Sequence, residues 1–243
     1  CGGTACAPRQ YYVTMKAVIL AAGKGRRMRP LTLTAPKPLL VVSGQPLLAH
    51  IIAALPAEIS ELVVVIGYRG EQIRAFLGEW FAGRPVRYVW QRELCGDAYA
   101  LRLSASLLTE ERFLLLYADA LHDPSALLEG LAHKRALLVA EHPEPQRFGV
   151  VFTNADGSVA GITEKPERPA SRLVSTGAMV LDANIFNYEP VRHANGEYYL
   201  TSMFDQMLRH HPVMAVRTDA WFPIATPEDL AAAETFLRRP VTA

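Results

Sequence analysis

The sequence predicts an α/β protein built on a doubly wound, mostly parallel β-sheet. Short apolar segments alternate with segments of helical character over residues 15–141. Continuous apolar runs are typical of strands buried on both faces, as in a parallel sheet covered by helices. Their alternation with helices indicates right-handed crossovers within one sheet. After residue 149 strand-like segments follow one another closely, which predicts β-rich insertions next to that sheet.

The first part of the chain supplies the expected sheet and its helices. Strands are expected at 17–20, 62–66, 86–90, 113–117 and 136–141. Helices are expected at 45–55, 70–77, 97–108 and 125–133. Ligands of such sheets bind beyond the carboxyl ends of the strands. We therefore expect a site just after Leu20, Ile66, Trp90 and Tyr117.

The second part supplies the expected insertions and two helices. Strands at 150–153 and 159–163 flank Asn154-Ala155-Asp156-Gly157, a sequence that favours a turn. A further strand is expected at 174–181, and helices are expected at 200–211 and 227–238. Thr226 followed by Pro227 is a typical helix start.

Composition excludes several classes of partner. Half of the 243 residues are hydrophobic and 20% are charged, as in ordinary globular proteins. The net charge of +1 lacks the basic excess with which nucleic-acid-binding proteins neutralise phosphates. No apolar run approaches the roughly 18 residues of a membrane span. The cysteines, Cys1, Cys6 and Cys95, show neither zinc-like spacing nor a disulfide framework. We expect a cytoplasmic protein without nucleic-acid or membrane partners.

Residues 1–14 differ from the rest of the chain. They show no periodic pattern and lack the apolar core of a signal peptide, whereas Met15 begins a clean strand. We interpret Met15 as the natural start. Residues 1–14 are expected to be a tail, disordered or foreign, and residues 15–243 a single domain.

The loop after the first expected strand carries the strongest functional signal. Its small residues let a ligand approach the backbone, whose amide groups can hold phosphate oxygens. They are Ala21, Ala22, Gly23 and Gly25, and the basic residues between and after them are Lys24, Arg26, Arg27 and Arg29. Lys37 follows between two prolines that stiffen the chain. The loop matches neither the dinucleotide-binding fingerprint nor the P-loop.

This loop and the segment after it form one combined pattern. It reads Ala21-Ala22-Gly23-x-Gly25-x-Arg27-Met28-x-Pro30-Leu31-Thr32, then Pro36-Lys37-Pro38-Leu39. The pattern resembles the signature of the sugar-1-phosphate nucleotidyltransferase family, although Arg26 stands where the family usually has threonine. The resemblance implies a Rossmann-like nucleotide-diphospho-sugar transferase fold. It also implies that the loop, Leu20 included, binds the nucleotide, that Arg27 contacts the departing pyrophosphate, and that Lys37 contacts phosphate.

Two later segments resemble further nucleotide-side elements of the family. The first is Gln91-x-x-x-x-Gly96-x-Ala98-x-Ala100-Leu101. There the resemblance implies that Gln91 hydrogen-bonds the base and Gly96 packs beneath it, while Asp97 replaces a family threonine. The second is Leu116-Tyr117-Ala118-Asp119, which resembles the strand that ends in the family's Gly-Asp metal site. Asp119 is therefore expected to bind Mg²⁺, which prefers one or two carboxylates with phosphate oxygens.

Three segments resemble the family's sugar side. They are Phe148-Gly149-Val150-Val151, Glu164-Lys165-Pro166 and Thr176-Gly177. By resemblance Gly149 backs the sugar, Glu164 accepts hydrogen bonds from its hydroxyls, Lys165 pairs with its phosphate, and Gly177 lies in a sugar-contacting turn. The alternative for Glu164 and Lys165 is an ordinary surface salt bridge.

The chain departs from the family pattern near its end. The segment is Trp221-Phe222-Pro223-Ile224-Ala225-Thr226-Pro227-Glu228-Asp229-Leu230. Pro223 stands where the family commonly has the aspartate that is its second metal ligand. Either Asp219 completes the site, or the triphosphate and water do.

The resemblance implies an enzyme that joins a nucleoside triphosphate to a sugar-1-phosphate and releases pyrophosphate, by direct in-line attack assisted by Mg²⁺. The attacking phosphate has a second pKa near 6, so no general base is needed. One alternative is a catalytically weak homologue that binds sugar nucleotides as a sensor or regulatory subunit, which Pro223 favours. Another is a choline-phosphate cytidylyltransferase-like enzyme. The base (uridine, thymidine or guanosine), the sugar (glucose, mannose or N-acetylglucosamine) and the oligomeric state, a homo-oligomer included, stay open.

Overall fold

The structure is a computed structural model that describes residues 15–109 and 112–238. The expected tail at residues 1–14 lies outside the described residues. The parallel half of the central sheet consists of β1 (Met15–Ala21), β4 (Ile59–Ile66), β6 (Arg84–Trp90) and β7 (Phe113–Tyr117), in the order β7-β1-β4-β6. The short strand β5 (Trp80–Phe81) pairs antiparallel with β6 at the edge.

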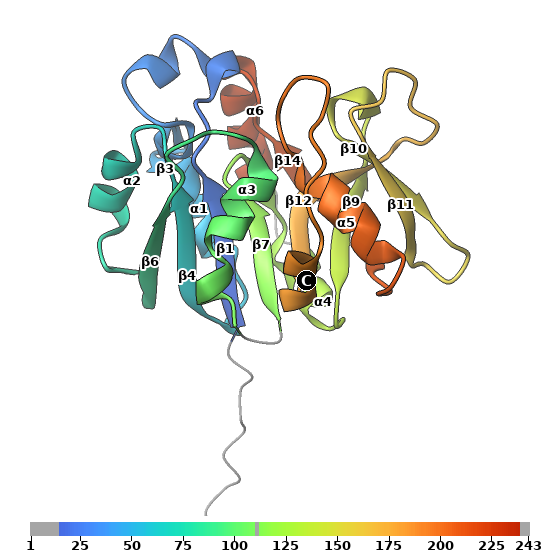
Figure 1. The fold of residues 1–243 in the computed structure, drawn as a ribbon. Coiled ribbons are helices and arrows are strands. Elements are labelled where there is room, and N and C mark those ends of the chain that lie inside the picture. The colour runs from blue at the N-terminus through green and yellow to red at the C-terminus, as the bar shows by residue number, and fades with distance from the viewer. Residues whose placement is uncertain (1–14, 110–111, 239–243) are drawn as a thin grey trace, which may run out of the picture.

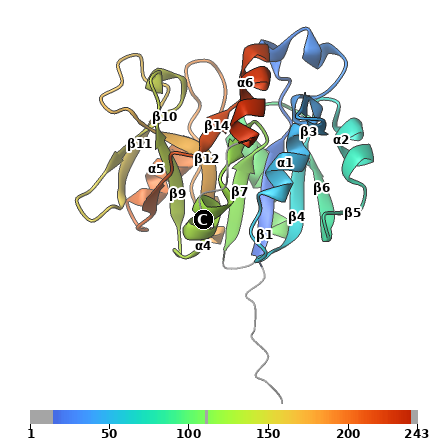
Figure 2. The same ribbon diagram turned by 180° about the vertical axis from the view of Figure 1, so that it is seen from behind.

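Helices cover both faces of this sheet, which explains the continuous apolar runs within β1, β4 and β7. α3 (Asp97–Leu103) and α5 (Leu200–Leu208) lie in front of the sheet in Figure 1. α1 (Leu47–Ala53), α4 (Pro124–Leu131) and α6 (Pro227–Leu237) lie on the other face, which Figure 2 shows from behind. α2 (Gly70–Leu77) buries Ile73 and Leu77, four residues apart, in the core of that second face.

The second half of the chain extends the sheet with strands of both directions. The long strand β12 (Leu173–Leu181) runs antiparallel to β7, and β9 (Ala136–Glu141) pairs with its other side. β13 (Met214–Arg217) then pairs parallel with β9. β10 (Gly149–Thr153) and β11 (Val159–Glu164) form the expected hairpin, whose turn closes through a hydrogen bond of 2.8 Å from Asn154 N to Ser158 O.

The prediction of a mostly parallel α/β sheet with β-rich insertions is therefore confirmed, with one difference in strand order. Residues 136–141 do form a strand, but it does not extend the parallel half directly. β12, which follows the β10–β11 hairpin in the chain, lies between β9 and β7 and pairs antiparallel with both.

Several expected helices are shorter than their sequence patterns. α1 begins at Leu47 rather than at residue 45, because β3 (Gln45–Pro46) pairs with β2 (Val41–Val42). α3 ends at Leu103 and continues only as a 3-10 turn, and α5 ends at Leu208 rather than at residue 211. α6 begins as expected, with Thr226 and Asp229 forming a reciprocal capping box.

The sheet brings the ends of its parallel strands to one edge. Leu20 is opposite Val65 of β4 and Tyr117 of β7, and Ile66 is opposite Trp90 of β6. The segments that follow these strands meet at the top of Figure 1. A second small sheet, β8 (Ala120–His122) with β14 (Trp221–Pro223), lies next to that edge. Over the described ranges, no helix is long and apolar enough to cross a membrane.

Candidate active site

The loop after β1 is shaped by a glycine in a left-handed conformation. Gly25 has φ of +57°, and a Cβ atom there would lie 3.0 Å from Lys37 Cβ and from Thr32 Cγ2. The Thr32 hydroxyl donates a hydrogen bond of 2.9 Å to the Gly25 carbonyl oxygen. A glycine at this position lets the loop fold tightly against Lys37. The loop borders a cavity of about 540 Å³, the first cavity.

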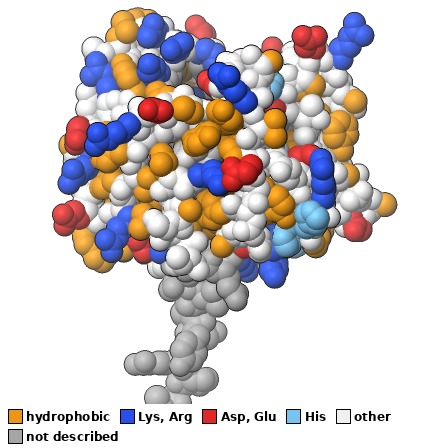
Figure 3. Space-filling view, viewed as in Figure 1, with side chains coloured by type: hydrophobic (Ala, Val, Ile, Leu, Met, Phe, Trp, Pro, Cys, Tyr) orange, Lys and Arg blue, Asp and Glu red, His pale blue; other side chains and the backbone are white. Residues whose placement is uncertain are grey.

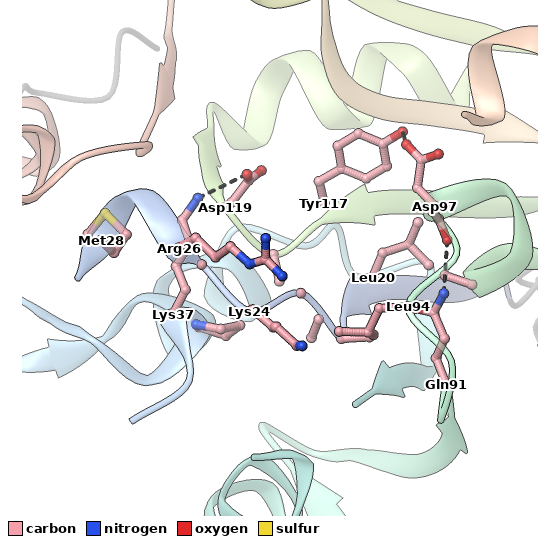
Figure 4. Close-up of a pocket in the computed structure, with 18 of the residues that line it drawn as sticks. Leu20, Lys24, Arg26, Met28, Lys37, Gln91, Leu94, Asp97, Tyr117 and Asp119 are labelled. Atoms are coloured by element: carbon pink, nitrogen blue, oxygen red, sulfur yellow. Dashed lines mark hydrogen bonds and ion pairs between the residues drawn. The ribbon is translucent and has the colours of Figure 1, made fainter. Parts of the chain in front are cut away.

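The residues expected to bind the nucleotide all border the first cavity (Figure 4). They are Leu20, Ala21, Ala22, Gly23, Gly25, Gln91 and Gly96. Backbone bonds hold their segments together at the edge of the sheet: Leu20 O accepts from Ala118 N at 3.1 Å, and Ala22 O accepts from Tyr68 N at 3.0 Å. The structure therefore brings these residues to one place.

The loop also concentrates positive charge. Lys and Arg side chains gather at the upper left of Figure 3, on the side where Figure 1 places the loop after β1. Lys24, Arg26 and Arg27 border the first cavity, whereas Arg29 does not. None of these four cations forms an ion pair with a residue in the part of the chain that the structure describes. Unpaired cations around a cavity favour an anionic ligand.

The base-reading segment of the resemblance forms one end of the cavity. Gln91 is buried, and its Nε2 donates a hydrogen bond of 2.9 Å to Gly96 O (Figure 4). Gly96 has φ of +119° and ψ of 175°, a conformation that belongs almost only to glycine. A Cβ atom there would lie 2.3 Å from Tyr198 O. The glycine thus lets residue 198 pack directly against this segment.

Lys37 and Asp119 form an ion pair beside the loop. Lys37 Nζ lies 3.0 Å from Asp119 Oδ2 (Figure 4). The Lys37 side chain is 11% exposed, whereas that of Asp119 is 47% exposed and open to the cavity. The carboxylate thus remains accessible to a cation, in addition to its bond with Lys37.

Asp119 would be the main protein ligand of a metal ion here. No group of three or more His, Cys, Asp or Glu suited to a metal ion occurs within residues 15–109 and 112–238. Pro223 pairs with Ala120 in the small sheet and borders the site without offering a side-chain ligand. Asp219 is exposed and does not border the first cavity. One carboxylate with substrate phosphate oxygens is nevertheless a common setting for Mg²⁺, so these residues fit that ion.

A second cavity, of about 150 Å³, adjoins the first. All residues expected on the sugar side border it, namely Gly149, Glu164, Lys165 and Gly177. Two of its glycines let neighbouring side chains pack directly on the backbone. A Cβ atom on Gly177 would lie 2.8 Å from Tyr117 Cδ2, and one on Gly149 would lie 3.0 Å from Ile162 Cδ1.

Lys165 is held between an acid and an aromatic ring. Its Nζ lies 2.9 Å from Glu164 Oε1 and 4.2 Å from the centre of the Tyr199 ring. Burial lowers the pKa of Lys165, but the charge and hydrogen bond of Glu164, with Tyr199, raise it more, so its net shift is upward. Lys165 is therefore a fixed cation at neutral pH. The Glu164–Lys165 salt bridge of the alternative interpretation does exist, and it borders the second cavity.

Asp97 is a site residue that the sequence did not assign. The Tyr117 hydroxyl donates to its Oδ2 at 2.5 Å, and Leu200 N donates to its Oδ1 at 2.8 Å. Burial raises the pKa of Asp97 to about 6, although the two hydrogen bonds oppose this shift. The residues that border both cavities are Arg27, Asp97, Tyr117, Asp119 and Ala225. The only signal in the sequence was an acid directly after Gly96, where the family has threonine.

An aromatic cluster forms another wall of the second cavity. The ring of Phe148 lies 5.2 Å from that of Trp221 and 4.6 Å from that of His142, both in edge-to-face contact. Phe148 and Trp221 border the cavity, together with Arg147. Sequence reasoning missed this cluster because Trp221 lies far along the chain from His142 and Phe148.

Comparison with known proteins identifies close relatives of this arrangement. The family model described as nucleotidyl transferase matches residues 16–239. A UTP–glucose-1-phosphate uridylyltransferase, AglF, of Haloferax volcanii is 37% identical to this chain. The match covers 94% of this chain and 98% of that relative. The bifunctional protein GlmU of Methanocaldococcus jannaschii is 31% identical over 92% of this chain, which spans only 54% of that relative.

Solved structures share the fold. A UDP-glucose pyrophosphorylase complexed with UDP-glucose superimposes with a TM-score of 0.79 at 23% identity, covering 93% of this chain and all of that one. Such similarity, at this low identity, concerns the arrangement of the sheet and helices.

Proposed function

The chain belongs to the nucleotidyl transferase family, and we propose that it transfers the nucleotidyl group of UTP to glucose 1-phosphate, with UDP-glucose and pyrophosphate as products. The choice of these substrates rests on the uridylyltransferase relative, which this chain matches nearly end to end. We also propose the cytoplasmic location that is expected from the sequence. Residues 15–243 form the proposed single catalytic domain.

The first cavity is the proposed triphosphate site. Lys24, Arg26 and Arg27 offer cations without partners among the described residues, and a triphosphate would neutralise them. The base would lie at the far end, next to Gln91 and Gly96. Gln91 Nε2 uses one of its two N–H groups on Gly96 O, so its second N–H can donate to the base and its Oε1 can accept from it.

Asp119 is the proposed ligand of Mg²⁺. Mg²⁺ bound there would supply charge neutralisation on the phosphate oxygens. Lys37, which is bonded to Asp119, lies close enough to share phosphate contacts with it.

The second cavity is the proposed site of the sugar-1-phosphate. Glu164 would accept hydrogen bonds from sugar hydroxyls, and Lys165 would hold the phosphate. Arg27, which borders both cavities, would stabilise the charge that develops on the leaving pyrophosphate. The bond that forms joins a sugar-phosphate oxygen to the α-phosphorus, and the bond that breaks joins the α-phosphorus to the bridging oxygen of pyrophosphate. Two anions must meet in line, so alignment and charge neutralisation are the main requirements.

One observation carries this proposal: two adjoining cavities, one lined by unpaired cations, share Arg27 and Asp119 at their junction. The experiment is a measurement of pyrophosphate release with Mg²⁺ over a matrix of nucleoside triphosphates and sugar-1-phosphates. Release that needs UTP and glucose 1-phosphate together is expected. Release with another matched pair would keep the reaction and correct the substrates.

A second candidate function is the binding of sugar nucleotides without turnover. It is favoured by Pro223, which offers no metal ligand next to Ala120. This function predicts tight binding of UDP-glucose and no pyrophosphate release with any pair.

A further inference from the structure

The strand β12 carries a bulge where it borders the second cavity. Its register against β9 shifts between Ser175 and Met179, so residues 176–178 stand opposite Leu138 alone. Gly177, in the middle of this bulge, has φ of +81° and borders the cavity. Bulges interrupt the hydrogen-bond ladder of a sheet and are frequent next to active sites. The shape of this cavity wall therefore depends on what holds the bulge.

Three side chains supply hydrogen bonds at the bulge. Thr176 Oγ1 donates to Leu138 O at 3.1 Å, and Gly177 N donates to Ser175 Oγ at 3.3 Å. The third is His122, whose Nε2 donates to Thr176 O at 3.2 Å. Thr176 is only 3% exposed and His122 only 6%. A carbonyl group that is buried in this way needs a donor from the protein.

His122 reaches the bulge from a different wall of the same cavity. It lies in β8, where its backbone is opposite Trp221 of β14, and Trp221 borders the second cavity. His122 itself borders neither cavity. Its backbone and its ring thus join two walls of the second cavity from behind.

The ring of His122 is neutral and carries a single N–H group. Burial lowers its pKa to about 4, although the bond to Thr176 O, the charge of Asp119 and the backbone of Ala120 oppose this shift. In a neutral imidazole one nitrogen donates and the other accepts. Because a carbonyl oxygen only accepts, the contact with Thr176 O requires the proton to be on Nε2.

We propose that His122 is a positioning residue for the sugar-1-phosphate, because its Nε2–H group holds the bulge of β12 in the shape that this substrate meets. The inference rests on the proposed function, in which the second cavity binds the sugar-1-phosphate. A phenylalanine would keep a ring at this position but leave Thr176 O buried without a donor, which is costly and favours movement of the bulge. Neither His122 nor the bulge borders the first cavity, so binding of the nucleotide should be spared.

The test is a steady-state assay of pyrophosphate release with Mg²⁺, in which the KM of each substrate is measured with the other saturating. His122→Phe is expected to raise the KM for glucose 1-phosphate roughly tenfold, about the worth of one lost hydrogen bond to a buried acceptor. The KM for UTP should stay within about threefold of the wild type, because the change removes an interaction on the sugar side alone. His122→Gln keeps an N–H donor and is expected to restore most of the affinity for glucose 1-phosphate.

A second histidine provides the matched control. His50 Nε2 lies 2.8 Å from Val42 O, again a backbone carbonyl, and His50 borders neither cavity. His50→Phe is expected to lower the unfolding temperature and to leave both KM values unchanged. Nitrogen-15 NMR of the wild-type imidazoles at neutral pH, with the His122 signals assigned by their loss in His122→Gln, is expected to show His122 protonated at Nε2.

Three results would overturn the inference: an unchanged KM for glucose 1-phosphate in folded His122→Phe, an equal rise of both KM values, or a ring protonated at Nδ1. The NMR result decides if His122→Phe fails to fold. If the wild type binds UDP-glucose without turnover, the proposed function fails but the inference is still tested by calorimetry. His122→Phe must then weaken the binding of UDP-glucose and spare that of UDP. If the wild type binds neither, both proposals fall together.

Discussion

Lys37 Nζ lies 3.0 Å from Asp119 Oδ2, so the candidate metal ligand is neutralised by a lysine of the chain itself. The lysine is nearly buried, whereas the aspartate is about half exposed. A cation that binds Asp119 must therefore share this carboxylate with Lys37, and the account makes opposite predictions for metal binding and for turnover.

Lys37→Gln is expected to strengthen the binding of Mn²⁺ to the free protein, because the Asp119 charge is no longer compensated. The same change is expected to lower kcat/KM by about a hundredfold, or roughly 3 kcal/mol, through the lost phosphate contact. Electron paramagnetic resonance titration with Mn²⁺ and a pyrophosphate assay measure the two effects. Weaker Mn²⁺ binding in the variant would show that the ion pair does not compete with the metal.

Arg27→Ala is expected to reduce kcat/KM by about a hundredfold, because Arg27 borders both cavities and has no ion-pair partner among the described residues. Arg29→Ala is the matched control, since Arg29 lies two residues away and borders neither cavity. It is expected to stay within about threefold of the wild type, as surface charges contribute little. Equal losses in the two variants would assign the effect to the overall charge of the loop.

Gly96→Ala is compared with the same change at a glycine where an added Cβ atom has open space around it. Gly83 also has positive φ, of +77°, but a Cβ atom there meets nothing within 4 Å. Gly83→Ala is thus expected to cost only the strain, about 1–2 kcal/mol. Gly96→Ala adds the clash with Tyr198 and a backbone conformation that belongs almost only to glycine, so its free energy of unfolding should fall further, and UTP should bind more weakly. Urea denaturation and calorimetry give both quantities. Equal losses of stability would show that Tyr198 moves away at little cost.

The pKa of Asp97 predicts a pH dependence of stability. Burial raises this pKa from 3.8 to about 6, with Tyr117, Leu200 N, Glu164 and Lys165 as the other groups that act on it. Between these two values the folded state binds more protons than the unfolded state, so the free energy of unfolding falls as pH rises from about 4 to above 6. The full effect is on the order of 3 kcal/mol.

Asp97→Asn should remove that contribution. The difference between wild type and variant, measured by urea denaturation at a series of pH values, is expected to decline through this window and then level off. A difference that grows with pH would mean that the folded state favours the ionised form of Asp97, against this account.

Much of the fold could be predicted because its signals are local. Residues 62–66 of β4 and 113–116 of β7 are unbroken apolar runs, and α2 spaces Ile73 and Leu77 along one face. The position of β12 in the sheet could not be predicted, because an apolar run does not indicate which strand it will pair with. The strands β8 and β14, each of three residues, are too short to show a period.

The candidate site likewise contains residues that could be predicted from the sequence and residues that could not. Lys37 and Gln91 were predicted from contiguous patterns, and the structure places both at the first cavity. Asp97 was not assigned, because its importance depends on Tyr117 and Leu200, which lie 20 and 103 residues away. The aromatic contact of Phe148 with Trp221 likewise exists only in the folded chain.

The central claim is tested most directly by pyrophosphate release from purified protein with Mg²⁺, UTP and glucose 1-phosphate. The account predicts release that requires all three components and that falls about a hundredfold in Arg27→Ala. Tight binding of UDP-glucose without release from any pair of nucleotide and sugar phosphate would contradict it, and would identify the protein as a binder of sugar nucleotides.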